Sequence, residues 1–132
     1  MEAHEFYVQP GQPILWQRIE AAVIFGLCLV MYYHLRLSGW LFVLLLLAPD
    51  LSMIGYTVSL SLGTTLYNLV HNYGIPLLVL TMGFALASEL VISVGLIWLA
   101  HCGMDRAVGY GLKYPTHFQH THLGKIGRDK MQ

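Results

Sequence analysis

Four stretches of this chain are apolar over nearly the length of a membrane-spanning helix, and this limits what the chain can fold into. A helix needs roughly 20 apolar residues to cross the hydrocarbon core of a bilayer. The four stretches cover about residues 20–35, 40–58, 66–87 and 89–110. Only 11% of the 132 residues are charged, whereas a typical soluble domain has about 25%. The sequence therefore predicts an all-α fold, an integral membrane bundle of four transmembrane helices with short connections.

We expect a single domain with a polar segment on each side of it. Residues 1–17 form the N-terminal polar segment, residues 18–110 the transmembrane domain, and residues 111–132 a short basic tail. Lys and Arg concentrate in cytoplasmic loops, so their positions predict orientation. Four crossings place six of the seven Lys and Arg residues on the side of both termini, and Arg36 alone on the other side. We therefore expect both termini and the tail in the cytoplasm.

Four ionisable side chains lie inside the apolar stretches, where a charged group costs a few kcal/mol or more. They are Asp50, His71, His101 and Asp105. His101 and Asp105 are four residues apart, so they share one face of a helix. At about 1.5 Å per residue, all four lie roughly 7–13 Å from the cytoplasmic end of their helices. The spacing therefore predicts that they converge at one depth.

Imidazole nitrogen and carboxylate oxygen are a donor set that suits zinc, iron or manganese. The four residues are therefore candidate ligands of zinc or another divalent transition metal. Asn68 and Tyr114 are candidates for orienting a substrate beside such a site. Spacing alone leaves two alternatives open. The same side chains could form a hydrogen-bonded ionic cluster that holds the helices together without a metal, or a path for protons.

Pro49 directly precedes Asp50 and interrupts the second apolar stretch. Proline removes a backbone donor and bends a helix. A bend at this point would expose backbone carbonyls beside the carboxylate, although a plain membrane kink is the alternative. Pro76 interrupts the third stretch in the same way.

The stretches APDLSMIGY, YNLVHNYGIP, IWLAHCGMDRAVGYGLKYP and THLGKIGR resemble a family of small bacterial membrane proteins, the domain of unknown function 4260. The resemblance covers about residues 18–128 and implies no activity. More distantly, the chain is similar to inner-membrane metal-dependent hydrolases related to zinc phospholipase C. Those proteins carry a Pro-Asp pair, a Thr-His-Ser element, and a His followed four residues later by Asp. The matching positions here are Pro49, Asp50, His71, His101 and Asp105.

Val70 and Asn72 stand where the distant hydrolases have Thr and Ser, so the resemblance is compatible with a single-metal site rather than a multi-metal one. It implies a metal-dependent hydrolase that acts on a lipid-like ester or phosphoester in the bacterial inner membrane. The alternative is a non-catalytic accessory subunit of a larger membrane complex, with the polar cluster being structural. Expected partners are the lipid bilayer and anionic lipid headgroups near the basic tail. The net charge of zero gives no reason to expect nucleic acid.

Overall fold

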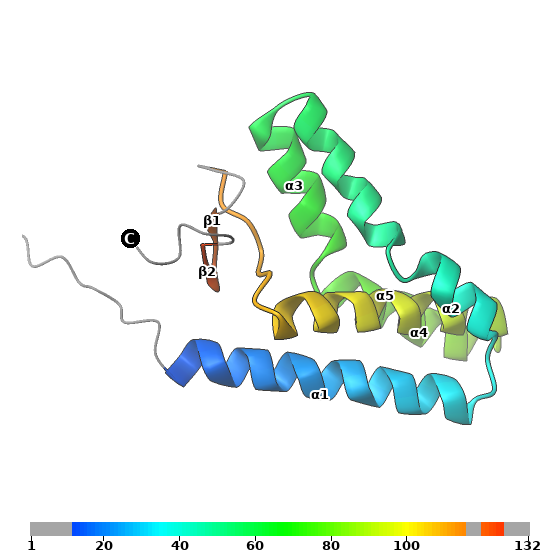
Figure 1. The fold of residues 1–132 in the computed structure, drawn as a ribbon. Coiled ribbons are helices and arrows are strands. Elements are labelled where there is room, and N and C mark those ends of the chain that lie inside the picture. The colour runs from blue at the N-terminus through cyan, green and yellow to red at the C-terminus, as the bar shows by residue number, and fades with distance from the viewer. Residues whose placement is uncertain (1–11, 116–119, 126–132) are drawn as a thin grey trace, which may run out of the picture.

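The computed structural model describes residues 12–115 and 120–125 and is almost entirely helical (Figure 1). Its helices are α1 (Gln12–His34), α2 (Gly39–Leu45), the 3-10 helix η1 (Ala48–Thr57), α3 (Leu60–Val70), α4 (Gly74–Ala85) and α5 (Glu89–Ala107). Two antiparallel strands of two residues each follow, β1 (His120–Thr121) and β2 (Gly124–Lys125). The predicted all-α class is confirmed. Parts of the predicted terminal segments, residues 1–11, 116–119 and 126–132, lie outside the described residues.

Helix α5 lies between α1 and α4, and more than half of its 19 residues are buried. It runs antiparallel to α1 (Figure 1), and the Arg18 Nε at the start of α1 donates to the Ala107 carbonyl at the end of α5 at 2.9 Å. The two helices share the hydrophobic core, in which Tyr32 of α1 packs with Ile92 and Leu96 of α5. Helix α5 therefore holds α1 and α4 together, whereas α3 packs mainly against η1.

Glycine lets α4 and α5 approach each other closely at two points. A Cβ at Gly95 would lie 2.7 Å from the Leu80 Cα, and one at Gly83 would lie 2.6 Å from the Ile92 backbone nitrogen. Neither site has room for a side chain. Small residues at facing positions are typical of tightly packed membrane helices.

Three helical segments are long and apolar enough to cross a membrane, judged by length and composition. They are Gln12–His34, Gly39–Thr57 and Glu89–Ala107. Large apolar side chains are exposed on the first two of them, among them Val30, Trp40 and Leu51. An exposed apolar surface of this extent is unusual in a soluble monomer. It indicates a membrane protein.

The prediction of one continuous helix over residues 66–87 is wrong. Helix α3 ends at Val70, α4 begins at Gly74, and with 11 and 12 residues each is too short to span a bilayer alone. The side chain of Asn72 joins the two helices across the break. Its Nδ2 donates to the Leu69 carbonyl at 2.6 Å, and its Oδ1 accepts from the Ile75 N–H at 3.1 Å. A fourth candidate transmembrane segment is therefore not found among the described residues.

The break after α3 leaves backbone carbonyls without helical partners, and side chains of α5 supply the missing donors. Trp98 Nε1 donates to the Val70 carbonyl at 2.6 Å, and Arg106 Nη2 to the His71 carbonyl at 3.5 Å. Such compensation is what allows a helix to be interrupted in apolar surroundings. It also fixes the end of α3 against α5.

Candidate metal centre

Four side chains meet where η1, the end of α3 and α5 come together. Asp50 belongs to η1, His71 caps α3, and His101 and Asp105 lie one turn apart on α5. One ligand atom of each lies within 4.8 Å of the other three. The structure thus brings together the four residues that the sequence singled out, and we call them the His/Asp cluster.

Both imidazole rings of the cluster are held by backbone carbonyls. His101 Nδ1 lies 2.6 Å from the Leu46 carbonyl oxygen, and His71 Nδ1 lies 3.0 Å from the Tyr67 carbonyl oxygen. A carbonyl oxygen can only accept, so each Nδ1 carries the proton and donates it. The Nε2 atoms are left to face the centre of the cluster. Metal-binding histidines are oriented in this way, by a hydrogen bond from the ring nitrogen that does not bind the metal.

The distances between the facing atoms are nearly equal. The two Nε2 atoms are 3.2 Å apart, and each lies 3.3 Å from Asp50 Oδ1. Asp105 Oδ2 lies 3.2 Å from His101 Nε2 and 3.6 Å from His71 Nε2. Four ligands placed tetrahedrally at about 2.0–2.1 Å from zinc are separated from one another by about 3.3–3.4 Å. Five of the six separations are therefore close to those of a tetrahedral zinc site, and the two carboxylate oxygens lie within 4.8 Å of each other.

Two imidazole rings and two carboxylates converge on one point, an arrangement that favours positive charge there. With each Nδ1 protonated, two Nε2 lone pairs and two carboxylates face one another. Protons on both rings would set two N–H groups against each other across the 3.2 Å that separate the Nε2 atoms. A proton on one ring would be donated to the Nε2 lone pair of the other ring as an N–H···N hydrogen bond at 3.2 Å, which is the metal-free cluster that the sequence leaves open. A divalent metal ion at this point would bind donor atoms of the buried members of the cluster and would balance the charge of the more exposed Asp50.

Pro49 explains why the Leu46 carbonyl is available to His101. In a continuous α-helix this carbonyl would accept the N–H of Asp50. That N–H instead bonds to the Leu47 carbonyl at 3.1 Å, because the chain changes from α2 to the 3-10 helix η1 around Pro49. The predicted opening of a carbonyl beside Asp50 is confirmed. The sequence did not identify Leu46 as a partner of His101, because every residue has a backbone carbonyl and the residue type does not show which one is free.

The cluster is closed on three sides and accessible at one carboxylate. The side chains of His101 and His71 are 0% and 3% exposed, that of Asp105 is 14% exposed, and that of Asp50 is 42% exposed. Among the described residues, Asp50 is therefore the member of the cluster most accessible to a substrate or water.

Asn68 and Tyr114, predicted to orient a substrate, lie at the junction of α3 with the tail. Asn68 Nδ2 donates to the Lys113 carbonyl at 2.8 Å, and Asn68 Oδ1 accepts the Lys113 N–H at 2.7 Å. Both ends of the Asn68 amide therefore hold the tail to α3. Tyr114 follows directly and is exposed. A role for either residue in catalysis stays a prediction.

The side chain of Lys113 is buried beside the cluster. Its Nζ lies 4.5 Å from the ring centre of Tyr67 and 5.3 Å from that of Tyr56. The Tyr67 ring in turn stacks on His71, with ring centres 3.8 Å apart. Burial lowers the pKa of Lys113 to about 8. The tail thus returns to the bundle and brings a cation close to a metal-ligand candidate.

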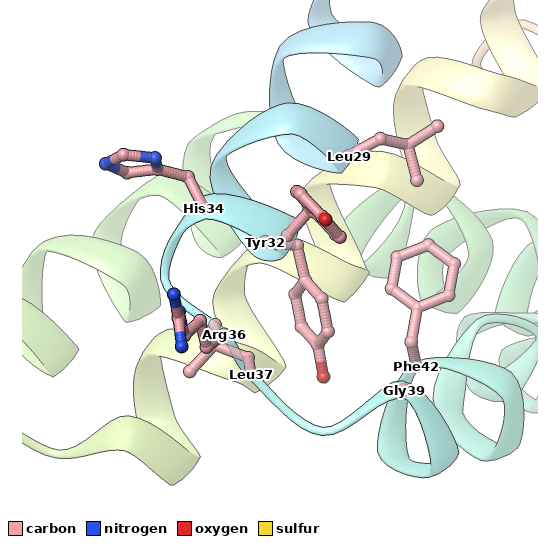
Figure 2. Close-up of a pocket in the computed structure, with 8 residues that line it drawn as sticks. Leu29, Tyr32, His34, Arg36, Leu37, Gly39 and Phe42 are labelled. Carbon is pink, nitrogen blue, oxygen red and sulfur yellow. The ribbon is translucent and has the colours of Figure 1, made fainter.

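A separate cavity of about 650 Å³ lies at the turn between α1 and α2, far along α1 from Arg18. Figure 2 shows Phe42 on one side of Tyr32, and His34 and Arg36 on the other. Of the residue types that bind transition metals, only His34 lines this cavity. It is therefore no second candidate for a metal.

One family model, "Domain of unknown function (DUF4260)", matches residues 14–126. The match includes every member of the His/Asp cluster. No curated protein and no solved structure matches the chain.

Proposed function

Since the chain belongs to the DUF4260 family, whose function is unknown, we propose a function from the His/Asp cluster itself. The cluster binds a divalent transition metal, with zinc the best fit, and hydrolyses an ester or phosphoester of a lipid-like molecule. The observation that carries the proposal is the orientation of His71 and His101. Each ring donates from Nδ1 to a backbone carbonyl, so both Nε2 atoms face the same point as two carboxylates.

The three least exposed members of the cluster are the proposed metal ligands. His71, His101 and Asp105 give two imidazoles and one carboxylate, a set found in catalytic zinc sites that keep the fourth position open. Asp50 lies on the accessible side and is the most exposed member. A bound ion supplies Lewis acidity, which activates water and polarises the ester or phosphoester.

Asp50 is the proposed general base. Its Oδ1 accepts a proton from a water molecule, whose oxygen forms the new bond to the carbonyl carbon or phosphorus. The bond to the leaving alkoxide breaks, and Asp50 returns the proton to the alkoxide oxygen. The distant resemblance to hydrolases related to zinc phospholipase C supports this chemistry, because it falls on the same four residues.

Metal analysis of the purified protein tests the proposal. Protein prepared without chelator should contain close to one equivalent of metal per chain by inductively coupled plasma mass spectrometry. His101→Ala should lose it. His34→Ala is the matched control, because His34 is an exposed histidine at the end of α1 outside the cluster, and it should retain the metal.

Wild-type protein with no more metal than His101→Ala would contradict the proposal. In that case we would expect Asp50→Asn and His101→Gln to lower thermal stability without affecting any turnover. Such a result would favour the alternative function, an accessory subunit of a larger membrane complex whose cluster holds the helices together.

A further inference from the structure

An apolar cavity of about 250 Å³ is lined by residues that adjoin the His/Asp cluster in the chain. Its walls come from the α2–η1 junction, the end of α3 and the middle of α5. The lining includes Leu45, Ala48, Pro49, Val70, Val94 and Trp98. Pro49 and Val70 each immediately precede a member of the cluster in the sequence. Ile97, which also lines the cavity, lies one turn before His101 on α5, so the cavity is close to the cluster although no member of the cluster lines it.

The walls of this cavity offer no side chain that could bind a polar group. The only polar side-chain atom among the lining residues is the indole nitrogen of Trp98, and it already donates to the Val70 carbonyl at 2.6 Å. A sugar or a nucleotide would lose its hydrogen bonds to water here without gaining others. Hydrocarbon loses nothing by entering. The volume lies just below the usual range for ligand pockets, about 300–1,000 Å³, which suits a length of alkyl chain rather than a fused ring system.

We propose that this cavity binds the hydrocarbon chain of a membrane amphiphile, and that the ester or phosphoester of the same molecule lies at the His/Asp cluster. The identity of the reacting group rests on the proposed function, whereas binding of the chain does not. The candidate membrane spans support this occupant, because alkyl chains are the solvent of such helices. A substrate whose hydrocarbon chain fills this cavity is an amphiphile rather than a water-soluble ester.

Trp98 provides a direct test, because it lines the cavity. A protein with Trp16→Phe and Trp40→Phe retains Trp98 as its one indole. In dodecyl maltoside, 11-bromoundecanoic acid should quench its fluorescence in a saturable manner, since bromine quenches on contact. Val94→Phe fills the cavity from α5 and should raise the half-saturating concentration by about tenfold or more. Ala48→Leu fills it from the opposite wall and should act in the same direction.

Leu90→Phe is the matched control, since it introduces the same aromatic ring one turn earlier on α5, at a residue that is 62% exposed. It should leave the quenching unchanged. If quenching instead increases linearly with the probe concentration, and does so equally with and without Val94→Phe or Ala48→Leu, the probe lies in the surrounding micelle. That result would overturn the inference.

The same titration separates this inference from the proposed function. Saturable quenching in a protein that binds no metal would support the chain site and contradict the hydrolase. Stoichiometric zinc without saturable quenching would support the metal site and overturn the chain site.

Discussion

The two carboxylates of the His/Asp cluster differ in a way that assigns them different roles. Asp105 is mostly buried on the same helix as His101, whereas Asp50 is 42% exposed on the accessible side. We predict that Asp50→Asn retains the metal but lowers kcat about 10²–10⁴-fold, the usual contribution of a general base. Hydrolysis of p-nitrophenyl octanoate, measured together with metal content, checks this.

Asp105→Asn is the comparison variant and should lose metal and activity together. The amide conserves the shape of the side chain, so a loss of metal reports the missing negative charge. If Asp50→Asn loses metal as completely as Asp105→Asn, Asp50 is a ligand and not the base.

Lys113 predicts a pH dependence of stability, because burial lowers its pKa from 10.5 to about 8. Between these values the unfolded chain binds a proton that the folded chain does not. The contribution of Lys113 to the free energy of unfolding therefore rises as the pH increases from 8 to 10.5. We predict that the Tm of the wild type in detergent increases relative to that of Lys113→Met across this range.

The comparison with Lys113→Met removes the titration of other groups, which both proteins share. Lys113→Arg serves as a second control, because arginine keeps its charge throughout. Its Tm should fall further below that of the wild type as the pH rises. A Tm difference between wild type and Lys113→Met that does not change with pH would contradict the prediction.

At the scale of helices, the sequence predicted those features that depend on one residue type or one spacing. The helical spacing of His101 and Asp105 placed both on one face of α5, and Pro49 indicated the bend that frees the Leu46 carbonyl. Hydropathy failed over residues 66–87. Hydropathy averages over many residues, so the single polar residue Asn72 does not interrupt the apolar stretch. The structure shows that its amide bonds to the end of one helix and the beginning of the next. The exact separations within the cluster depend on how three helices pack, which no local pattern contains.

The contact between α4 and α5 gives a prediction about helix packing. A methyl group at Gly95 would lie 2.7 Å from the Leu80 Cα, so Gly95→Ala must push the backbones apart. Overpacking of this kind costs about 1–3 kcal/mol. We expect a lower Tm in detergent for Gly95→Ala than for the wild type.

Gly26→Ala is the matched control, since a Cβ at Gly26 of α1 would have no neighbour within 4 Å. It should be neutral or slightly stabilising, because alanine favours the helix. Equal Tm values for Gly95→Ala and Gly26→Ala would mean that α4 and α5 do not pack as closely as the structure shows.

At the scale of the whole molecule, the antiparallel pair of α1 and α5 constrains the topology in a membrane. Arg18 bonds to the Ala107 carbonyl at one end of the pair, and Tyr32 packs with Ile92 towards the other (Figure 1). If both helices cross the bilayer, His34 and Glu89 lie on one side of it. The chain between them must then cross an even number of times. If the span Gly39–Thr57 crosses the membrane once, the chain must cross back before α5 begins. The two short helices α3 and α4 are the segment available for this second crossing.

We therefore predict that both termini lie on the same side, although three helical segments among the described residues are long and apolar enough to span a membrane. The excess of Lys and Arg near the termini predicts that this side is the cytoplasm. In intact bacterial cells, a membrane-impermeant maleimide should label His34→Cys and Glu89→Cys equally, and green fluorescent protein fused to the C-terminus should fluoresce. The native Cys28 and Cys102 are buried, so the label reports the introduced thiols. Labelling of only one of the two variants would show that α1 and α5 do not both cross the membrane. The topology proposed for the chain would then be wrong, and with it the position of the His/Asp cluster relative to the bilayer.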